Sequence, residues 1–188
     1  LKTSTYPYGA FITPGLTDAL GLASAKPELF FIPDDPALEF YRPLFANTVC
    51  MLEKRNASFD NSKTLTTAKL MDKMLEENDH RPQQQDVLKA RLMDMLIADY
   101  DRHLDQWRWG SIDTGKGKIY YPIPRDRDQS FFYSNGRLLR FISGRSMPFL
   151  KGFREDIPSV NWLNYIARDF DRIFLTDLDQ EDWEKTLN

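Results

Sequence analysis

The sequence predicts an α+β fold in which helices predominate and a small antiparallel β region accompanies them. Two patterns support this prediction: apolar residues recur at helical spacing in several segments, and short apolar runs are bounded by proline, glycine or charged residues. Hydrophobic residues make up 41% of the 188-residue chain and aromatic residues 13%, which is typical of a folded protein with one sizeable core. We therefore expect one compact unit.

The first 60 residues predict a short helix followed by a β-hairpin. Residues 11–23 read as a turn and a helix, with Pro14 suited to an early helical position. Residues 29–32 and 48–52 are apolar runs of strand length. They are separated by a long loop, so their pairing rests on the runs alone and not on a tight turn.

Two amphipathic helices follow. Residues 62–77 show apolar positions at helical spacing, with Asn61 or Ser62 as the N-cap. Residues 83–98 form the strongest helical pattern of the chain, because the apolar stripe there is widened by further apolar residues. We expect this second helix to be largely buried and to lead directly into the charged segment behind it.

The C-terminal half predicts short strands and then helices. Residues 118–124 and 130–133 read as strands, with Asn135-Gly136 as a hairpin tip. The prolines of the first run place it at a sheet edge. A helix is expected where these apolar residues share one face: Trp162, Leu163, Ile166, Phe170, Ile173 and Phe174. A final helix carries Trp183, with Asp179 or Thr176 as its cap.

Charge and cysteine content narrow the range of partners. The formal net charge of −3 provides no bulk attraction to nucleic acid, so we expect no nucleic-acid partner and only local anion sites. Cys50 is the only cysteine, which excludes an intrachain disulfide and a thiolate metal cluster. No apolar run is long enough to predict a membrane span.

The stretch ADYDRHLDQWRW, residues 98–109, is the first candidate for chemistry. In kinase-type phosphoryl transfer one aspartate accepts the proton of the attacking hydroxyl, and a residue five positions later holds metal together with a downstream aspartate. Asp101 and Gln106 have this spacing, and Asp126 has the downstream position. His103 lies beside Asp101 and is a second catalytic candidate, although a lone histidine is also typical of a structural hydrogen-bonding role.

The stretch IPRDRDQSF, residues 123–131, is the second candidate. In an extended segment Asp126 and Asp128 would face one side, and Arg125 and Arg127 would face the other. Two carboxylates and an amide suit a hard cation such as Mg²⁺ or Mn²⁺. Arg102 and Arg125 are the candidate phosphate-binding residues. The alternative interpretation is that these charges only form ordinary ion pairs and organise a loop.

The Asp101-Arg102-His103 sequence, the polar residue at position 106 and the downstream Asp126 resemble the catalytic loop and metal-binding aspartate of atypical kinase-like folds. These folds include HipA, the spore-coat CotH kinases and the secretory-pathway kinases. The resemblance implies that Asp101 is the catalytic base, that Asp126 is the principal metal ligand assisted by Asp128, and that ATP is bound with the cation. Gln106 departs from the asparagine usual in such loops.

A wider likeness covers most of the chain. The segments TYPYGAFITPGLTDALGL, FFIPDDPAL, LKARLMDMLIADYDRHLDQWRW and YYPIPRDRDQSFF resemble a region of bacterial envelope proteins that combine a metallophosphoesterase domain with a BamA-type surface-antigen barrel. This likeness implies a periplasmic or surface-exposed location. It also implies that other domains of the same longer chain are partners.

Together these resemblances imply a helix and β-hairpin region at 1–60 and a region like a kinase C-terminal lobe at 61–188. The expected function is atypical kinase-like phosphotransfer, or nucleotide and metal binding. The alternative is a non-catalytic, pseudokinase-like interaction domain of an outer-membrane-associated protein. The first 60 residues contain no glycine-rich phosphate loop and no valine-alanine-isoleucine-lysine motif. We therefore expect little kinase activity from these 188 residues by themselves.

Overall fold

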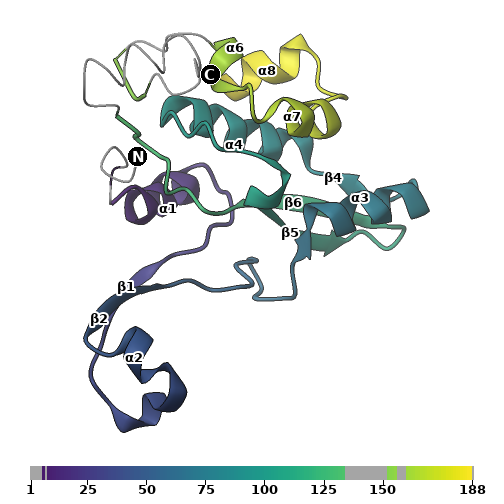
Figure 1. Cartoon of the computed structure of the whole chain (residues 1–188). Helices are drawn as coiled ribbons and strands as arrows, with labels where there is room; N and C mark the ends of the chain where they lie inside the picture. The colour runs from purple at the N-terminus through teal and green to yellow at the C-terminus, as the bar shows by residue number, and fades with distance from the viewer. Residues whose placement is uncertain (1–5, 7, 134–151, 156–159, 188) are drawn as a thin grey trace.

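The computed structural model describes residues 6, 8–133, 152–155 and 160–187, and its fold is α+β as predicted. A four-stranded sheet is covered by helices on one face, and a two-stranded hairpin projects away from this body (Figure 1). The expected turn at Asn135-Gly136 lies outside the described residues. In the described part of the chain, no helix is long and apolar enough to cross a membrane.

The sheet has the order β3-β5-β6-β4, and its central pair is a hairpin formed by β5 (Trp107–Asp113) and β6 (Lys118–Pro124). Strand β5 was not predicted, because its tryptophans follow a charged segment without clear alternation. The outer strands are short: β3 (Leu65–Thr66) is antiparallel to β5, and β4 (Arg81–Pro82) is parallel to β6. The sheet is therefore mixed and not purely antiparallel.

The prediction that β6 is an edge strand was wrong, because β6 lies between β5 and β4. Its prolines are tolerated for a local reason. The carbonyl of Tyr120 accepts a hydrogen bond from the Gln83 backbone N–H, and alternate residues of a strand direct their backbone groups to the same side. Pro122 and Pro124 therefore lack an N–H only on the side where β4 has already ended.

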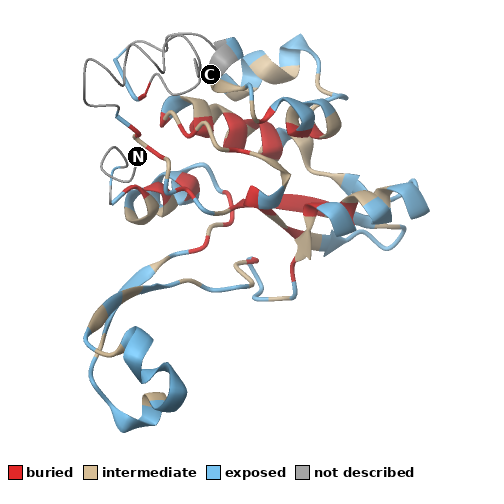
Figure 2. Ribbon diagram, viewed as in Figure 1, coloured by how far each residue is buried: buried red, intermediate tan, exposed pale blue. Residues whose placement is uncertain are grey.

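Helix α4 (Gln84–Leu96) is the buried helix predicted from residues 83–98. It packs against the sheet and against the C-terminal helices, and much of it is buried (Figures 1 and 2). Ala98 adopts a left-handed conformation with φ of 52°, and the Asp99 N–H bonds to the Asp94 carbonyl at 2.9 Å. This capping geometry ends the helix and directs the chain into the segment 99–106, as expected.

The core is aromatic. Trp107 and Trp109 alternate along β5 and so face the same side of the sheet, where both are fully buried. They meet Phe170 and Phe174 of α7 (Arg168–Phe174), with the Trp107 and Phe170 rings stacked at a centroid distance of 4.3 Å. The paired tryptophans of the sequence are thus core residues that hold the C-terminal helices on the sheet.

Several boundaries differ from those predicted. Helix α1 covers Gly9–Ala19, and α3 covers Thr67–Glu76. The N-cap of α3 is Thr66, whose hydroxyl accepts from the Lys69 N–H, so the prediction of Asn61 or Ser62 was wrong. The cause is tertiary: residues 65–66 pair with β5 and delay the start of the helix.

The C-terminal elements show further differences. Residues 130–133 contain no strand. The single helix expected around residues 162–174 is divided into α6 (Val160–Leu163) and α7. The last helix, α8 (Gln180–Leu187), begins after Asp179, whose carboxylate accepts from the Asp182 N–H at 3.0 Å. Of the two predicted caps, Asp179 is therefore the one used.

The predicted hairpin near the N-terminus is confirmed. Strands β1 (Glu28–Ile32) and β2 (Thr48–Leu52) pair antiparallel. The long loop between them is filled by a 3₁₀ helix, Pro36–Tyr41, and by α2 (Arg42–Phe45). We call residues 28–52 the arm. None of its residues is buried (Figure 2), whereas α1 before it contacts the body through a Thr17 hydroxyl bond to the Met93 sulfur.

Candidate functional site

Part of the charge crowded around residue 101 lies inside the protein. Asp94 of α4 is fully buried and is surrounded by three buried arginines. Its carboxylate oxygens lie 3.0 Å from Arg91, 3.3 Å from Arg102 and 2.8 Å from Arg127. We call Asp94 and these three arginines, together with Asp99, the buried ion cluster. Ionised side chains at this depth persist only when they are paired, so the cluster fixes the elements that contribute to it.

Arg102 connects the two segments that carry the candidate site. Its guanidinium donates to the backbone carbonyl of Arg125 at 2.7 Å and to that of Gln106 at 3.3 Å, and it lies over the Trp107 ring. The side chain has no exposed area. It therefore cannot reach a ligand, and the predicted phosphate-binding role does not fit its position.

Asp99 is the member of the cluster whose buried charge has the fewest compensating contacts. It is fully buried, and neither carboxylate oxygen has a hydrogen-bond partner among the described residues. Burial raises the pKa of Asp99 to about 6, although the Arg102 guanidinium opposes this shift from 3.7 Å away. Its charge is thus held in the folded protein at a cost.

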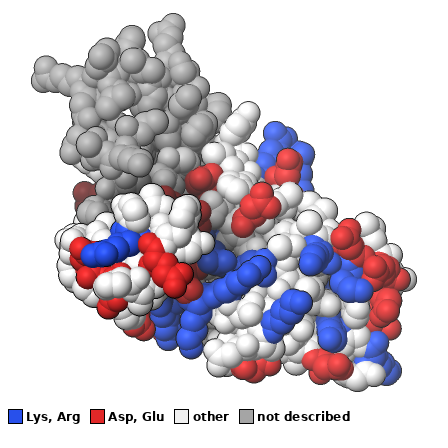
Figure 3. All heavy atoms as spheres, turned by 60° about the horizontal axis from the view of Figure 1, so that its bottom comes forward, with Lys and Arg blue, Asp and Glu red and all other residues white. Residues whose placement is uncertain are grey.

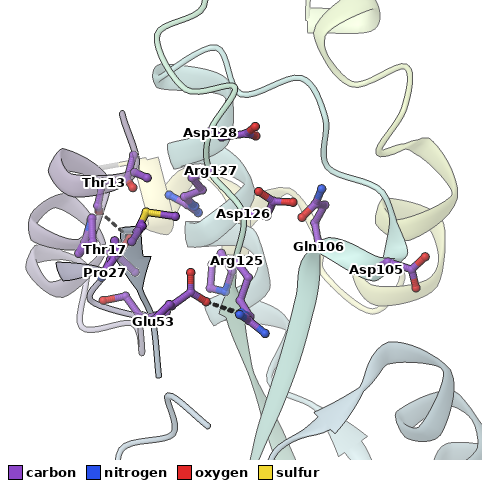
Figure 4. Close-up of a pocket in the computed structure, with 16 residues that line it drawn as sticks. Thr13, Thr17, Pro27, Glu53, Asp105, Gln106, Arg125, Asp126, Arg127 and Asp128 are labelled. Carbon is purple, nitrogen blue, oxygen red and sulfur yellow. Dashed lines mark hydrogen bonds and ion pairs between the residues drawn. The ribbon is translucent and has the colours of Figure 1, made fainter. Parts of the chain in front are cut away.

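A pocket of about 290 Å³ opens beside this cluster (Figure 4). Four parts of the chain form it: helix α1, the residues at the base of the arm, the turn at residues 105–106 before β5, and the segment that follows β6. Predicted site residues lie in its wall, namely Gln106, Arg125, Asp126 and Asp128. Residues from two predicted segments, about 20 positions apart, therefore meet at one cavity.

Asp126 and Asp128, which line this pocket, do not lie on an extended strand. Asp126 has φ of 54°, a left-handed conformation that aspartate tolerates better than most residues. The predicted alternation was therefore wrong, because Arg125 to Asp128 all contribute to the pocket wall. Arg127 turns inward, where it contacts Asp94 and the Met93 sulfur.

The carboxylates near the pocket shift the pKa of Asp128. Burial raises the pKa of Asp128, the negative charge of Asp126 raises it further, and Asp101 adds to the effect. Asp126 and Asp101 are thus each close enough to Asp128 to interact with it electrostatically. An excess of negative charge at one place favours a cation there.

Arg125 lies at the pocket with its charge already paired. Its Nε donates to Glu53 Oε1 at 2.6 Å, and Glu53 follows the second strand of the arm. Its backbone N–H bonds to the Gln106 carbonyl at 2.9 Å. Arg125 therefore joins the base of the arm to the Asp126 segment, and any phosphate would share it with Glu53.

His103 lies between Asp101 and Gln106. Its Nε2 is 3.9 Å from Asp101 Oδ1 and 3.3 Å from the Gln106 side-chain amide. Its Nδ1 accepts the Asp105 backbone N–H at 3.3 Å, so the proton of the neutral ring is on Nε2 and can be donated to Asp101. The Gln106 amide nitrogen is itself a donor, so Gln106 can accept from this Nε2–H only through its amide oxygen. This geometry suits a residue that orients Asp101 and Gln106.

The donor set decides which cation would fit. Among the described residues, no three His, Cys, Asp or Glu side chains converge to form a metal cage by themselves. Four carboxylates line the pocket. Glu53 is paired with Arg125, and Asp105 points away from the other two (Figure 4), which leaves two carboxylates and one amide for a cation. Mg²⁺ is commonly held by one or two carboxylates, with waters and substrate phosphates completing its shell. The residues therefore fit a cation that arrives with phosphate better than an all-protein metal site.

Sequence reasoning missed Glu53 and the buried members Arg91 and Asp94. Arg91 and Asp94 carried a usable signal, because they interrupt the apolar residues of a helix predicted to be buried. Glu53 carried no such signal, since only tertiary structure brings the end of the arm to Arg125.

No protein-family model matches the chain, and no curated protein matches its sequence.

Proposed function

We propose that the pocket binds a divalent cation together with nucleotide phosphates, and that the chain is the phosphotransfer part of an atypical kinase-like protein of the cell envelope. The observation that supports this most is the convergence of Gln106, Asp126 and Asp128 on one cavity, with Asp101 within electrostatic reach. The envelope location rests on the sequence resemblance alone.

Each residue has a distinct task in this proposal. Asp126 and Asp128 hold the cation, and the Gln106 amide is the third donor. The cation, when bound, neutralises charge on the phosphoryl oxygens. Asp101 keeps 37% of its side-chain surface accessible, and it accepts the proton of an acceptor hydroxyl. His103 keeps the Asp101 and Gln106 side chains in place.

The buried ion cluster holds the two segments that carry the site in fixed positions. Phosphoryl transfer depends mostly on positioning and electrostatics, so small displacements of the metal-binding segment are costly. Arg102 bonds to backbone carbonyls of both segments that form the site. The cluster thus provides a rigid base for Asp126, whose left-handed backbone needs support from its surroundings.

A non-catalytic, pseudokinase-like domain is the second candidate. The burial of charged residues favours this candidate, because Asp99, Arg102 and Arg127 are all buried inside the protein and are therefore not free to bind a substrate. In that case the pocket would bind ligand without turnover, or would bind none.

Thermal-shift titration with Mn²⁺ and ATP tests the proposal. We expect ATP with Mn²⁺ to raise the melting temperature of the wild type more than either does alone, because the cation and phosphate complete each other's shells. Asp126→Asn should abolish this joint shift. Asp72→Asn, which neutralises an exposed aspartate of α3, is the matched control and should retain it.

Three results separate the candidates. Joint binding with phosphate transfer that is lost in Asp101→Asn supports the enzyme. Joint binding without transfer is expected of these 188 residues by themselves in both cases, so transfer that stays undetectable when the upstream lysine and phosphate loop of a kinase are also present supports the pseudokinase-like domain. An identical shift in the wild type and Asp126→Asn would contradict the pocket assignment itself.

A further inference from the structure

The arm exposes an unusual amount of apolar surface. Phe31 is 62% exposed, Val49 65% and Phe40 83%, and no residue between 28 and 52 is buried. Figure 1 shows the arm extending away from the body, so the helices and the four-stranded sheet do not cover it. An isolated two-stranded hairpin is at best marginally stable in water. Surface of this kind marks an interaction site.

The register shows that one face of the arm is a continuous apolar surface. Leu29 pairs with Met51, and Phe31 pairs with Val49. Alternate residues of a strand share a face, so these four side chains lie together. All four are more than one-third exposed. We call them the apolar face of the arm.

The strands also lack the features that discourage edge pairing. Strand β2 contains no charged residue and no proline, and β1 contains one charge, Glu28, at its first position. Within the described residues each of these strands pairs only with the other. Proteins usually protect such edges with charges, prolines or bulges, and that protection is missing here.

Charge is distributed unevenly along the arm. Its tip carries Asp34, Asp35 and Glu39 against one cation, Arg42, which pairs with Asp34. Cations are in excess at the base of the arm, where Lys54, Arg55, Lys63 and Arg108, which we call the basic base, lie with the acidic residues Glu28, Glu53 and Asp60. Glu53 is already paired with Arg125. Figure 3 shows Lys and Arg side chains gathered on the face that comes forward.

The basic base has few carboxylate partners of its own. Among the described residues Arg55 and Lys63 form no ion pair, and Arg108 bonds only to Thr64. Arg125 and Arg55 lower the pKa of Arg108, after the larger effect of burial. These cations are thus close enough to repel one another, and an anionic partner would relieve the repulsion.

We propose that the arm pairs with the arm of a second copy of this chain. The two arms lie antiparallel about a two-fold axis, with their apolar faces in contact and the acidic tip of each against the basic base of the other. A strand of five residues spans roughly 17 Å at about 3.4 Å per residue, so the acidic and basic ends are separated enough to meet opposite ends of the partner.

The charge order argues for a second copy over other occupants. A two-fold interface must be self-complementary, and an arm with an acidic tip, an apolar middle and a basic base meets this condition. An anionic bilayer would attract the base but repel the tip. The interface would also adjoin the pocket, because Met51 and Glu53 contribute to its wall. The proposal is nevertheless independent of what the pocket binds.

Sedimentation equilibrium on the full chain tests this proposal. We expect a monomer–dimer equilibrium in the wild type. Phe31→Asp should raise the dimer dissociation constant by at least ~10-fold, because it places a charge within the apolar face. Leu75→Asp, at an 86% exposed apolar residue of α3, is the matched control and should leave the constant unchanged.

A charge-reversal pair makes the test specific for antiparallel arms. The tip variant is Asp35→Lys with Glu39→Lys, and the base variant is Arg55→Glu with Lys63→Glu. Each variant alone should dimerise less than the wild type, since like charges then meet at both ends of the interface. An equimolar mixture should recover dimers, because each tip then meets a base of opposite sign.

Circular dichroism should show that all four variants are folded, since none of the altered residues is buried. A wild type that stays monomeric at every concentration would overturn the proposal. So would dimers that survive Phe31→Asp, or a mixture that does no better than its components. Binding of the monomeric wild type to phosphatidylglycerol vesicles would assign the arm to a lipid surface instead.

Discussion

The arm and the buried ion cluster have opposite relations to water. The arm places phenylalanine, valine and leucine side chains in solvent, whereas the cluster places three arginines and two aspartates in the interior. Each is unusual in a globular protein. The difference shows that a side chain is buried only where the fold places suitable partners around it. The arginines of the cluster are buried because carboxylates lie within contact distance. The apolar side chains of the arm stay exposed because no core packs against them.

The comparison also predicts that substitutions in the two regions affect different properties, namely folding stability for the cluster and association between chains for the arm. Removing one member of the cluster leaves other charges buried without compensation, so its effect should appear in folding. Removing an apolar side chain from the arm changes little inside the monomer, so its effect should appear in association.

The largest effect is expected for Asp94→Ala. Three arginines would lose the carboxylate that they share, and breaking a buried pair typically costs about 3–5 kcal/mol. Urea denaturation followed by circular dichroism should show this loss. The control is Asp86→Ala, on the same helix, which removes only a partly exposed pair with Lys89 and should cost less than ~1 kcal/mol. Equal stability of the two variants would show that the cluster is not a structural unit.

A smaller, pH-dependent effect is expected at Asp99. Its pKa is raised from 3.8 in the unfolded reference to about 6 in the folded protein. The folded state therefore binds the proton more tightly, and the stability gained from that proton is present below pH ~4 and lost as the pH rises through ~6. The loss should be on the order of 3 kcal/mol, since one unit of pKa corresponds to roughly 1.4 kcal/mol.

Asp99→Asn provides the measurement, because its side chain has a similar shape and does not titrate. The free energy of unfolding of the wild type minus that of Asp99→Asn should fall between pH 4 and pH 6 and level off above. A difference that stays constant with pH would mean that Asp99 keeps an ordinary pKa.

The smallest effect on folding is expected for Phe31→Ser in the arm. Phe31 is 62% exposed in the monomer, so its truncation should change the free energy of monomer unfolding by less than ~0.5 kcal/mol. Denaturation at a concentration below the dimer dissociation constant measures this. A cost of several kcal/mol would mean that the arm is covered within the monomer and would remove the contrast with the cluster.

Local sequence patterns predicted the elements whose stabilising contacts lie near in sequence. The apolar stripe of residues 83–98 predicted a buried helix, and α4 has that burial. The apolar runs of the arm predicted strands that do pair. Boundaries failed where distant segments intervene, as at Thr66, where pairing with β5 moves the helix start.

For the candidate site, the sequence by itself determined the residue types and their spacing: Asp101, Gln106, Asp126 and Asp128 were identified without coordinates. Tertiary structure alone decided which charges face the pocket. Arg102 was predicted to bind phosphate, and Arg127 was predicted only to face away from the aspartates, yet both side chains contact the buried Asp94. The physical reason is that the sequence states which residues carry a charge, but not what surrounds them. Whether a charged side chain is buried or exposed depends on its desolvation and its ion pairs, and both involve groups that only folding brings together.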